Sequence, residues 1–126
     1  MNMKTTEKIK VLLIKPDEHP VVTEIGNTLG SLQKCVGGFI QMVMLSETAA
    51  IICNEEGKLN GLDANRRYFN DVIVGDFIIV GIDDEDTVSL SDEDIEEYKK
   101  IFWEPGEGIQ SPKMDDLSLD WSFLFN

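Results

Sequence analysis

The sequence contains few of the residues from which most metal centres and catalytic sites are built. It has one histidine, His19, and two cysteines, Cys35 and Cys53, among 126 residues. A structural zinc site needs four nitrogen or sulfur ligands at close spacing, and these three residues are too few. The sequence therefore predicts no metal site. The simplest interpretation is that both cysteines are small buried apolar side chains. A disulfide between them is the alternative.

Long apolar runs and positive charges are also scarce. No apolar segment approaches the ~18–20 residues that a membrane-spanning helix needs, and residues 1–10 lack the apolar centre of a secretion signal. We therefore expect a cytoplasmic protein. The chain has 11 basic and 24 acidic residues, a net charge of −13. This balance argues against direct binding to nucleic acid, because Lys and Arg must neutralise the phosphates.

The negative charge is concentrated in the C-terminal third of the chain. Residues 1–82 hold 10 acidic and 8 basic side chains, whereas residues 83–126 hold 14 acidic and 3 basic ones. Such a one-sided distribution makes a local negative field, which suits a positively charged partner. The alternative is an exposed acidic surface that serves only solubility, since runs of charge are usually solvated.

The apolar pattern predicts a single α+β domain. The hydrophobic fraction of 42% is enough for a core. We expect a mainly antiparallel sheet of about four strands, at residues 11–14, 39–45, 48–53 and 72–80, the middle two forming a hairpin. Apolar side chains recur in steps of three and four over residues 21–36, which predicts a helix ended by Gly37 and Gly38.

A second helix is predicted at residues 89–102. Ser91 is a suitable N-cap, with Asp94 three residues later. Acidic residues in its first turn and lysines in its last turn both suit the helix dipole. Residues 58–71 have weak periodicity and are interpreted as a loop that holds a short helix around residues 63–69. Gly75 inside the strand at 72–80 indicates a bulge or a close backbone approach.

Several segments, taken together and in order, resemble one family. They read LLIKPDEHP, EIGNTLGSLQKCVGGFIQMV, ICNEEGKLNGLDANRR and DVIVGDFIIVGIDDEDTVSLSDEDIEEYKKIF. This order resembles the DUF3846 family, a domain of unknown function found in bacteriophages and other mobile genetic elements. The resemblance covers about residues 8–102. It implies a small α+β domain within residues 1–102, with no established enzymatic activity. Residues 103–126 lie outside the resemblance and are interpreted from their composition as a Gly/Pro/Ser-rich acidic and aromatic tail.

No Ser/His or Cys/His pairing, phosphate-binding glycine loop or calcium-loop pattern stands out, so we expect neither enzymatic activity nor a cofactor. The leading hypothesis is an accessory protein of a phage or mobile element that inhibits a host defence protein. Its acidic face would occupy the Lys/Arg-lined nucleic-acid channel of a basic partner through charge complementarity. Aromatic residues of the tail would add apolar anchors, unless the tail packs on its own domain or on a sister subunit of a homo-oligomer. The residues expected to bind the partner are Asp83, Asp84, Glu85, Asp86, Asp92, Glu93, Asp94, Glu96, Glu97, Trp121, Phe123 and Phe125.

An alternative hypothesis is a binding module for a nucleotide signal that carries phosphate. Neighbouring arginines would grip the phosphate, because a guanidinium group can donate two parallel hydrogen bonds to it. Ordinary turn chemistry explains the same glycine and asparagine residues. An enzyme of unknown type is the lesser alternative. The residues of the expected ligand site are Asn54, Glu55, Asn65, Arg66, Arg67 and Tyr68.

Overall fold

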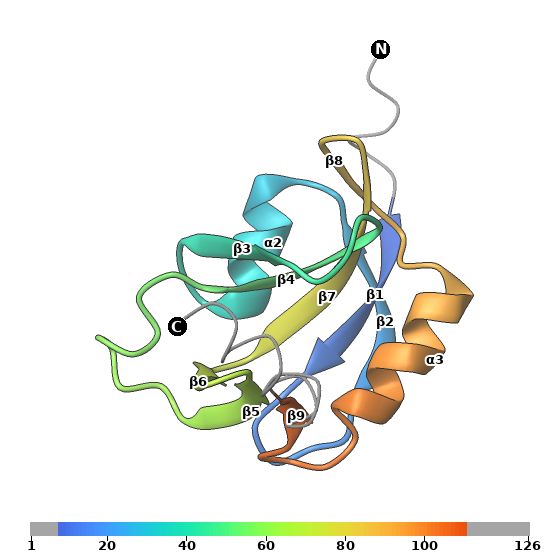
Figure 1. The fold of residues 1–126 in the computed structure, drawn as a ribbon. Helices are drawn as coiled ribbons and strands as arrows, with labels where there is room; N and C mark the ends of the chain where they lie inside the picture. The colour runs from blue at the N-terminus through green and yellow to red at the C-terminus, as the bar shows by residue number, and fades with distance from the viewer. Residues whose placement is uncertain (1–7, 111–126) are drawn as a thin grey trace, which may run out of the picture.

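A six-stranded sheet forms the centre of the fold (Figure 1). The structure is a computed structural model, and it describes residues 8–110. The strands follow the order β2-β1-β7-β4-β3, and the short β8 also pairs with β7. Every pairing in this sheet is antiparallel. The strands are β1 (Lys8–Ile14), β2 (Val21–Gly26), β3 (Ile40–Met44), β4 (Ala49–Asn54), β7 (Phe77–Asp83) and β8 (Asp86–Val88).

A smaller sheet and two helices complete the described fold. The smaller sheet has the order β6-β5-β9, in which β9 (Gly108–Ile109) runs parallel to β5 (Ala64–Tyr68). Its third strand is β6 (Asp71–Val74), and the helices are α2 (Leu29–Val36) and α3 (Asp92–Ile101). The first residues of the segment interpreted as a tail therefore belong to the fold, since β9 pairs with β5.

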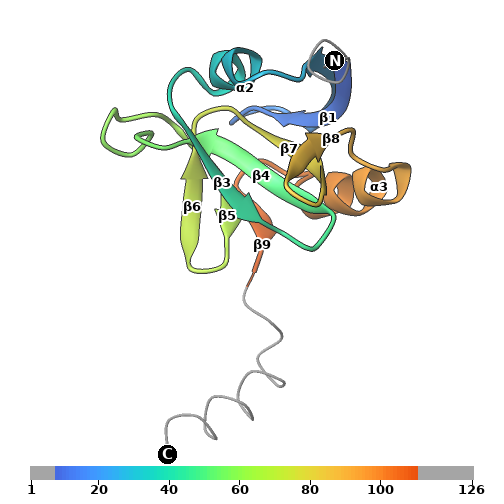
Figure 2. The same cartoon turned by 90° about the horizontal axis from the view of Figure 1, so that it is seen from above.

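Both faces of the large sheet are buried. On one face Leu12, Ile51 and Ile79 pack with α3 and the smaller sheet, and on the other Ile52 and Ile78 pack with α2. Figure 2 shows α2 on one side of the sheet and α3 on the other. Successive side chains of a strand point to opposite faces, so a strand covered on both sides reads as a continuous apolar run. This explains why β1, β4 and β7 were visible in the sequence.

Several expectations are confirmed. The fold is α+β, and β3 and β4 form the expected antiparallel hairpin. The hydroxyl of Ser91 accepts a hydrogen bond from the Asp94 amide at the start of α3, and Gly37 ends α2 with a φ of 76°. The number of strands was wrong. The structure has six strands in one sheet and three in the other within residues 8–110, where about four were expected.

The helix expected over residues 21–36 is wrong in its first half. Residues Val21–Gly26 form β2, which pairs along its length with β1 at an edge of the sheet. The helix begins only after Thr28, whose side chain accepts a hydrogen bond from the Ser31 amide. Val21, Val22, Thr23 and Ile25 are β-branched and favour a strand, so the helical spacing across both segments was coincidental.

Two other segments also differ from the expectation. The loop with a short helix at residues 58–71 was wrong at its centre, because β5 occupies residues Ala64–Tyr68. The single strand expected at residues 72–80 is interrupted at Gly75, which has a φ of 76°, so β6 and β7 belong to different sheets. A Cβ atom at Gly75 would lie 2.6 Å from the Leu62 Cδ1 atom, which explains the glycine at this close approach.

Candidate functional site

Nine acidic side chains lie on the β7–β8 hairpin and on α3, and we call this set the acidic surface. No Lys or Arg occurs within residues 83–97, which contain all nine. Eight of them are exposed and Asp94 is half-buried. β8 leads into α3 through residues 89–91, and Figure 1 shows the tip of the β7–β8 hairpin at the top of the molecule and α3 at its right side. The members are Asp83, Asp84, Glu85, Asp86, Asp92, Glu93, Asp94, Glu96 and Glu97.

A glycine allows the segment between β8 and α3 to pass close to β7. Gly81 of β7 pairs with Val88 of β8, and the chain then passes over Gly81 at Ser89. A Cβ atom at position 81 would lie 2.2 Å from the Ser89 carbonyl oxygen, so a larger residue cannot be accommodated without displacing this segment. The turn itself uses Asp84 with a φ of 64°, a conformation that Asp tolerates better than most residues.

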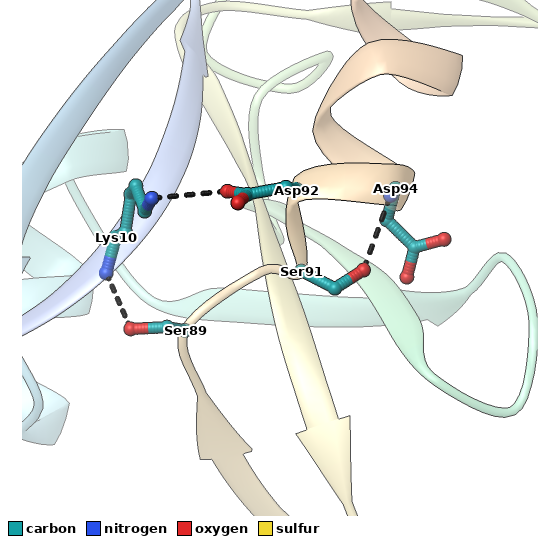
Figure 3. Close-up of polar contacts among 5 residues, drawn as sticks. All are labelled: Lys10, Ser89, Ser91, Asp92 and Asp94. Atoms are coloured by element: carbon teal, nitrogen blue, oxygen red, sulfur yellow. Dashed lines mark hydrogen bonds and ion pairs between the residues drawn. The ribbon is translucent and has the colours of Figure 1, made fainter.

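Polar contacts fix the start of α3 to the sheet (Figure 3). The Lys10 ammonium group lies 3.1 Å from the Asp92 Oδ1 atom, and the Lys10 amide donates a 2.9 Å hydrogen bond to the Ser89 hydroxyl. Asp94 Oδ2 accepts a 2.8 Å hydrogen bond from the hydroxyl of Thr48, in the β3–β4 turn. Asp92 and Asp94 therefore have roles within the fold.

The other seven members of the acidic surface make no hydrogen bond or ion pair through their side chains within residues 8–110. The helix dipole favours Asp92 and Glu93 in the first turn of α3, and Lys99 and Lys100 lie in the last turn. The acidic side chains of α3 also affect the pKa of a buried residue, Tyr98. Burial raises the pKa of Tyr98, and Glu97 and Asp94 raise it further against the opposing hydrogen bond with Ser46.

The structure separates the residues of the expected ligand site from one another. Asn54, Glu55 and Tyr68 line a hollow of about 340 Å³ between β3 and β6. Asn65, Arg66 and Arg67 are not among its lining residues. Arg67 is exposed and donates a 3.2 Å hydrogen bond to the Phe69 carbonyl. The six residues are therefore not brought together.

Arg66 is fully buried, with 0% of its surface exposed, and its guanidinium group binds the main chain. It donates a 2.8 Å hydrogen bond to the Phe102 carbonyl and a 2.5 Å hydrogen bond to the Glu18 carbonyl. It also donates a 2.8 Å hydrogen bond to the Asn65 Oδ1 atom. Burial lowers the pKa of Arg66, while Glu104 and Asp17 oppose this shift. The side chain thus clamps the end of α3 to the loop after β1.

Asn65 continues this clamp. Its Nδ2 atom donates hydrogen bonds to the Ile14 carbonyl at 3.0 Å and to the Gly75 carbonyl at 2.7 Å, and Asn65 is 1% exposed. Reasoning from the sequence missed this role because it interpreted the segment as a loop. In a strand, neighbouring side chains point to opposite sides. One of two consecutive arginines is therefore directed inward, which is the signal that a strand assignment would have provided.

The remaining candidate residues have ordinary surroundings. Both cysteines are free, and burial raises the pKa of each thiol, with a further contribution from Asp76 at Cys35. The ring of His19 stacks on Trp103 at a centroid distance of 4.0 Å. Residues 8–110 contain no group of three or more metal-ligating side chains, and no helix among them is long and apolar enough to cross a membrane. Trp121, Phe123 and Phe125 lie outside the described residues.

Comparison with known proteins identifies the class of this α+β domain. The model of the family described as a domain of unknown function, DUF3846, matches residues 9–102. The chain belongs to this family, and the matched region runs from the second residue of β1 to the end of α3 and contains the whole acidic surface. Neither a search of curated proteins nor a search of solved structures gave a match.

Proposed function

We propose that this protein is a non-enzymatic binding protein whose acidic surface occupies the Lys/Arg-lined channel of a nucleic-acid-binding partner. The observation that carries this proposal is the set of seven acidic side chains that have no polar partner within residues 8–110 and come from a stretch without a single base. Such a set presents negative charge that has no basic side chain bound to it, as a phosphate backbone does. Blocking the channel would make the protein an inhibitor, which suits an accessory protein of a mobile element that acts against a host defence protein in the bacterial cytoplasm.

The physical consequences of this mode of binding are specific. Complementary charges accelerate encounter between two proteins and suppress wrong partners. Exposed charges are screened over about 8–10 Å at ordinary ionic strength, so binding must weaken as salt is added. The acidic surface is rigid at its base, since Lys10, Thr48 and Ser91 fix the first turn of α3. A pre-organised surface loses less conformational freedom on binding.

The same structure gives little support to binding of a phosphate-bearing nucleotide. Three acidic residues, Glu55, Glu56 and Asp71, line the hollow between β3 and β6, against one lysine, Lys58. That lysine forms an ion pair with Asp71. The donors of Arg66 are directed to main-chain carbonyls. An anionic ligand would therefore meet net negative charge in this hollow.

The proposal is tested with two variants of equal net charge. Each replaces four exposed glutamates by lysine and so changes the net charge from −13 to −5. One variant alters the acidic surface, and the matched control alters acidic side chains elsewhere. The altered residues are Glu85, Glu93, Glu96 and Glu97 in the first variant and Glu24, Glu55, Glu56 and Glu107 in the control.

Proteins from a bacterial lysate are captured on the immobilised wild-type protein and on each folded variant, at low and at high salt. We expect one basic protein to be retained by the wild-type protein and by the control at low salt, and to be lost from the acidic-surface variant and at high salt. Equal retention by both variants would reject the proposal, because the acidic surface would then have no special role.

A further inference from the structure

The hollow between β3 and β6 lies between two strands that end their sheets. β3 is an edge strand of the large sheet and β6 is an edge strand of the small sheet. Within residues 8–110 each therefore has a strand partner on one side alone. Val43, Cys53 and Ile73 give the hollow an apolar lining. Two further lining residues, Leu59 and Val72, are 85% and 39% exposed. The hollow thus combines apolar surface with unpaired strand edges, which is the kind of site that takes an additional strand.

The tail of the chain has the pattern of such a strand. Apolar side chains occupy every second position, and serine or aspartate stands at most positions between them. Alternation of this kind, which Leu124 interrupts once, is typical of a strand with one apolar face. The polar set is Ser118, Asp120 and Ser122, and Asp120 is the one acidic residue within residues 117–125. The apolar set is Leu117, Leu119, Trp121, Phe123 and Phe125.

The tail can reach the hollow without a change in the described fold. The described residues end at Gln110, directly after β9, and β9 lies two strand positions from β6 in the same sheet. Two strand spacings are about 10 Å. Residues 111–116 precede the alternating segment, and six residues can extend over about 20 Å. A tether this short also keeps the local concentration of the tail high, which favours the hollow of the same chain over that of a second copy.

We propose that residues 117–125 bind in the hollow between β3 and β6 of their own chain as an added strand. The apolar set packs on Val43 and Ile73, which belong to the same core face, and the polar set faces solvent. This inference is independent of the proposed function, because the hollow and the acidic surface share no residue. It also assigns Trp121, Phe123 and Phe125 a role within the protein, so that the partner meets the acidic surface without them.

The test uses the full chain with Trp103→Phe, which leaves Trp121 as the sole tryptophan. Accessibility of Trp121 to acrylamide is measured by fluorescence quenching in this background and in two further variants of it. Val72→Asp places a charge in the hollow, and Val22→Asp is the matched control, because both valines lie in edge strands and are 39% exposed. The mass of each protein in solution is measured by light scattering.

We expect Trp121 to be shielded in the monomer, to be several-fold more accessible with Val72→Asp, and to be unchanged with Val22→Asp. Full accessibility of Trp121 in the parent protein would overturn the proposal. So would equal shielding in all three proteins, since the tail would then be buried elsewhere. Shielding that occurs in a dimer and disappears on dilution would also overturn it, because the hollow would then hold the tail of a second copy.

Discussion

Replacing Arg66 by alanine tests the account of the buried clamp. The substitution removes the donors to the Phe102 and Glu18 carbonyls and to the Asn65 side chain. These acceptors belong to segments that are 36 to 48 residues away from Arg66 in the sequence, with Asn65 as the adjacent exception. The clamp therefore connects β5 to both the end of α3 and the loop after β1.

The magnitude follows from the acceptors left behind. A buried polar group without a partner costs about 1–3 kcal/mol, and hydrogen bonds to charged groups are at the strong end of the range. Three close acceptors lose a charged donor in the alanine variant. Part of this loss is offset, because the alanine variant no longer buries a charged guanidinium group and because water can enter the vacated space. We expect the free energy of unfolding to fall by about 3–5 kcal/mol.

Urea unfolding measured by circular dichroism provides the free energy for the wild-type protein and for each variant. Arg67→Ala is the matched control, because this neighbouring arginine is exposed and its side chain donates one hydrogen bond within residues 8–110, to the Phe69 carbonyl at 3.2 Å. The control is expected to change stability by about 0.5 kcal/mol or less. Arg66→Lys should recover little, since an ammonium group lacks the planar fork. A loss at Arg66→Ala no larger than that at Arg67→Ala would refute the clamp.

Three further outcomes follow from local geometry. Ser91→Ala should lower the free energy of unfolding by about 1 kcal/mol in urea titrations, because the N-cap of α3 is lost, and no loss would contradict the cap. Gly81→Ala should lower the melting temperature by a margin that corresponds to about 2–3 kcal/mol, since its Cβ atom meets the Ser89 carbonyl, and a melting curve like that of the wild type would contradict this close approach. The hydrogen bonds from Lys58 and from the amide of Val72 lower the pKa of Asp71, so its small contribution to stability is present above its unfolded pKa and is lost as the pH falls through the folded pKa. An NMR titration of the carboxyl group should show this pKa rising toward its ordinary value in Lys58→Ala, and an unchanged titration would contradict it.

The sequence predicted best those elements whose signals are local. The β3–β4 hairpin, the Ser91 cap and the Gly37 helix end each depend on a few consecutive residues, and the structure confirms all three. β2 and β5 had local signals that were misleading or weak. β2 pairs with β1, its neighbour in the sequence, but its apolar spacing matched that of a helix, and β5 pairs with β6 and also with β9, which lies some forty residues later. Such pairing overrides weak local periodicity.

The same distinction applies to the candidate site. The acidic surface was visible because charge is a property of the sequence, and exposure of these side chains follows from their cost of burial. The sequence could not show that Asp92 and Asp94 are bound to Lys10 and Thr48, because those contacts join distant segments. The inward direction of Arg66 was hidden for the same reason, since it depends on the strand β5.

The central claim is that the acidic surface, and not the overall negative charge, binds a basic partner. The most direct measurement is the dissociation constant of the captured partner for the wild-type protein and for the two variants of net charge −5, by calorimetry at one ionic strength. Four exposed charge pairs at about 0.2–1 kcal/mol each, together with repulsion from the new lysines, predict a loss of affinity of about 10- to 100-fold or more for the acidic-surface variant. The control should stay within about threefold of the wild-type protein, which is about 0.6 kcal/mol. Equal losses in the two variants would contradict the claim.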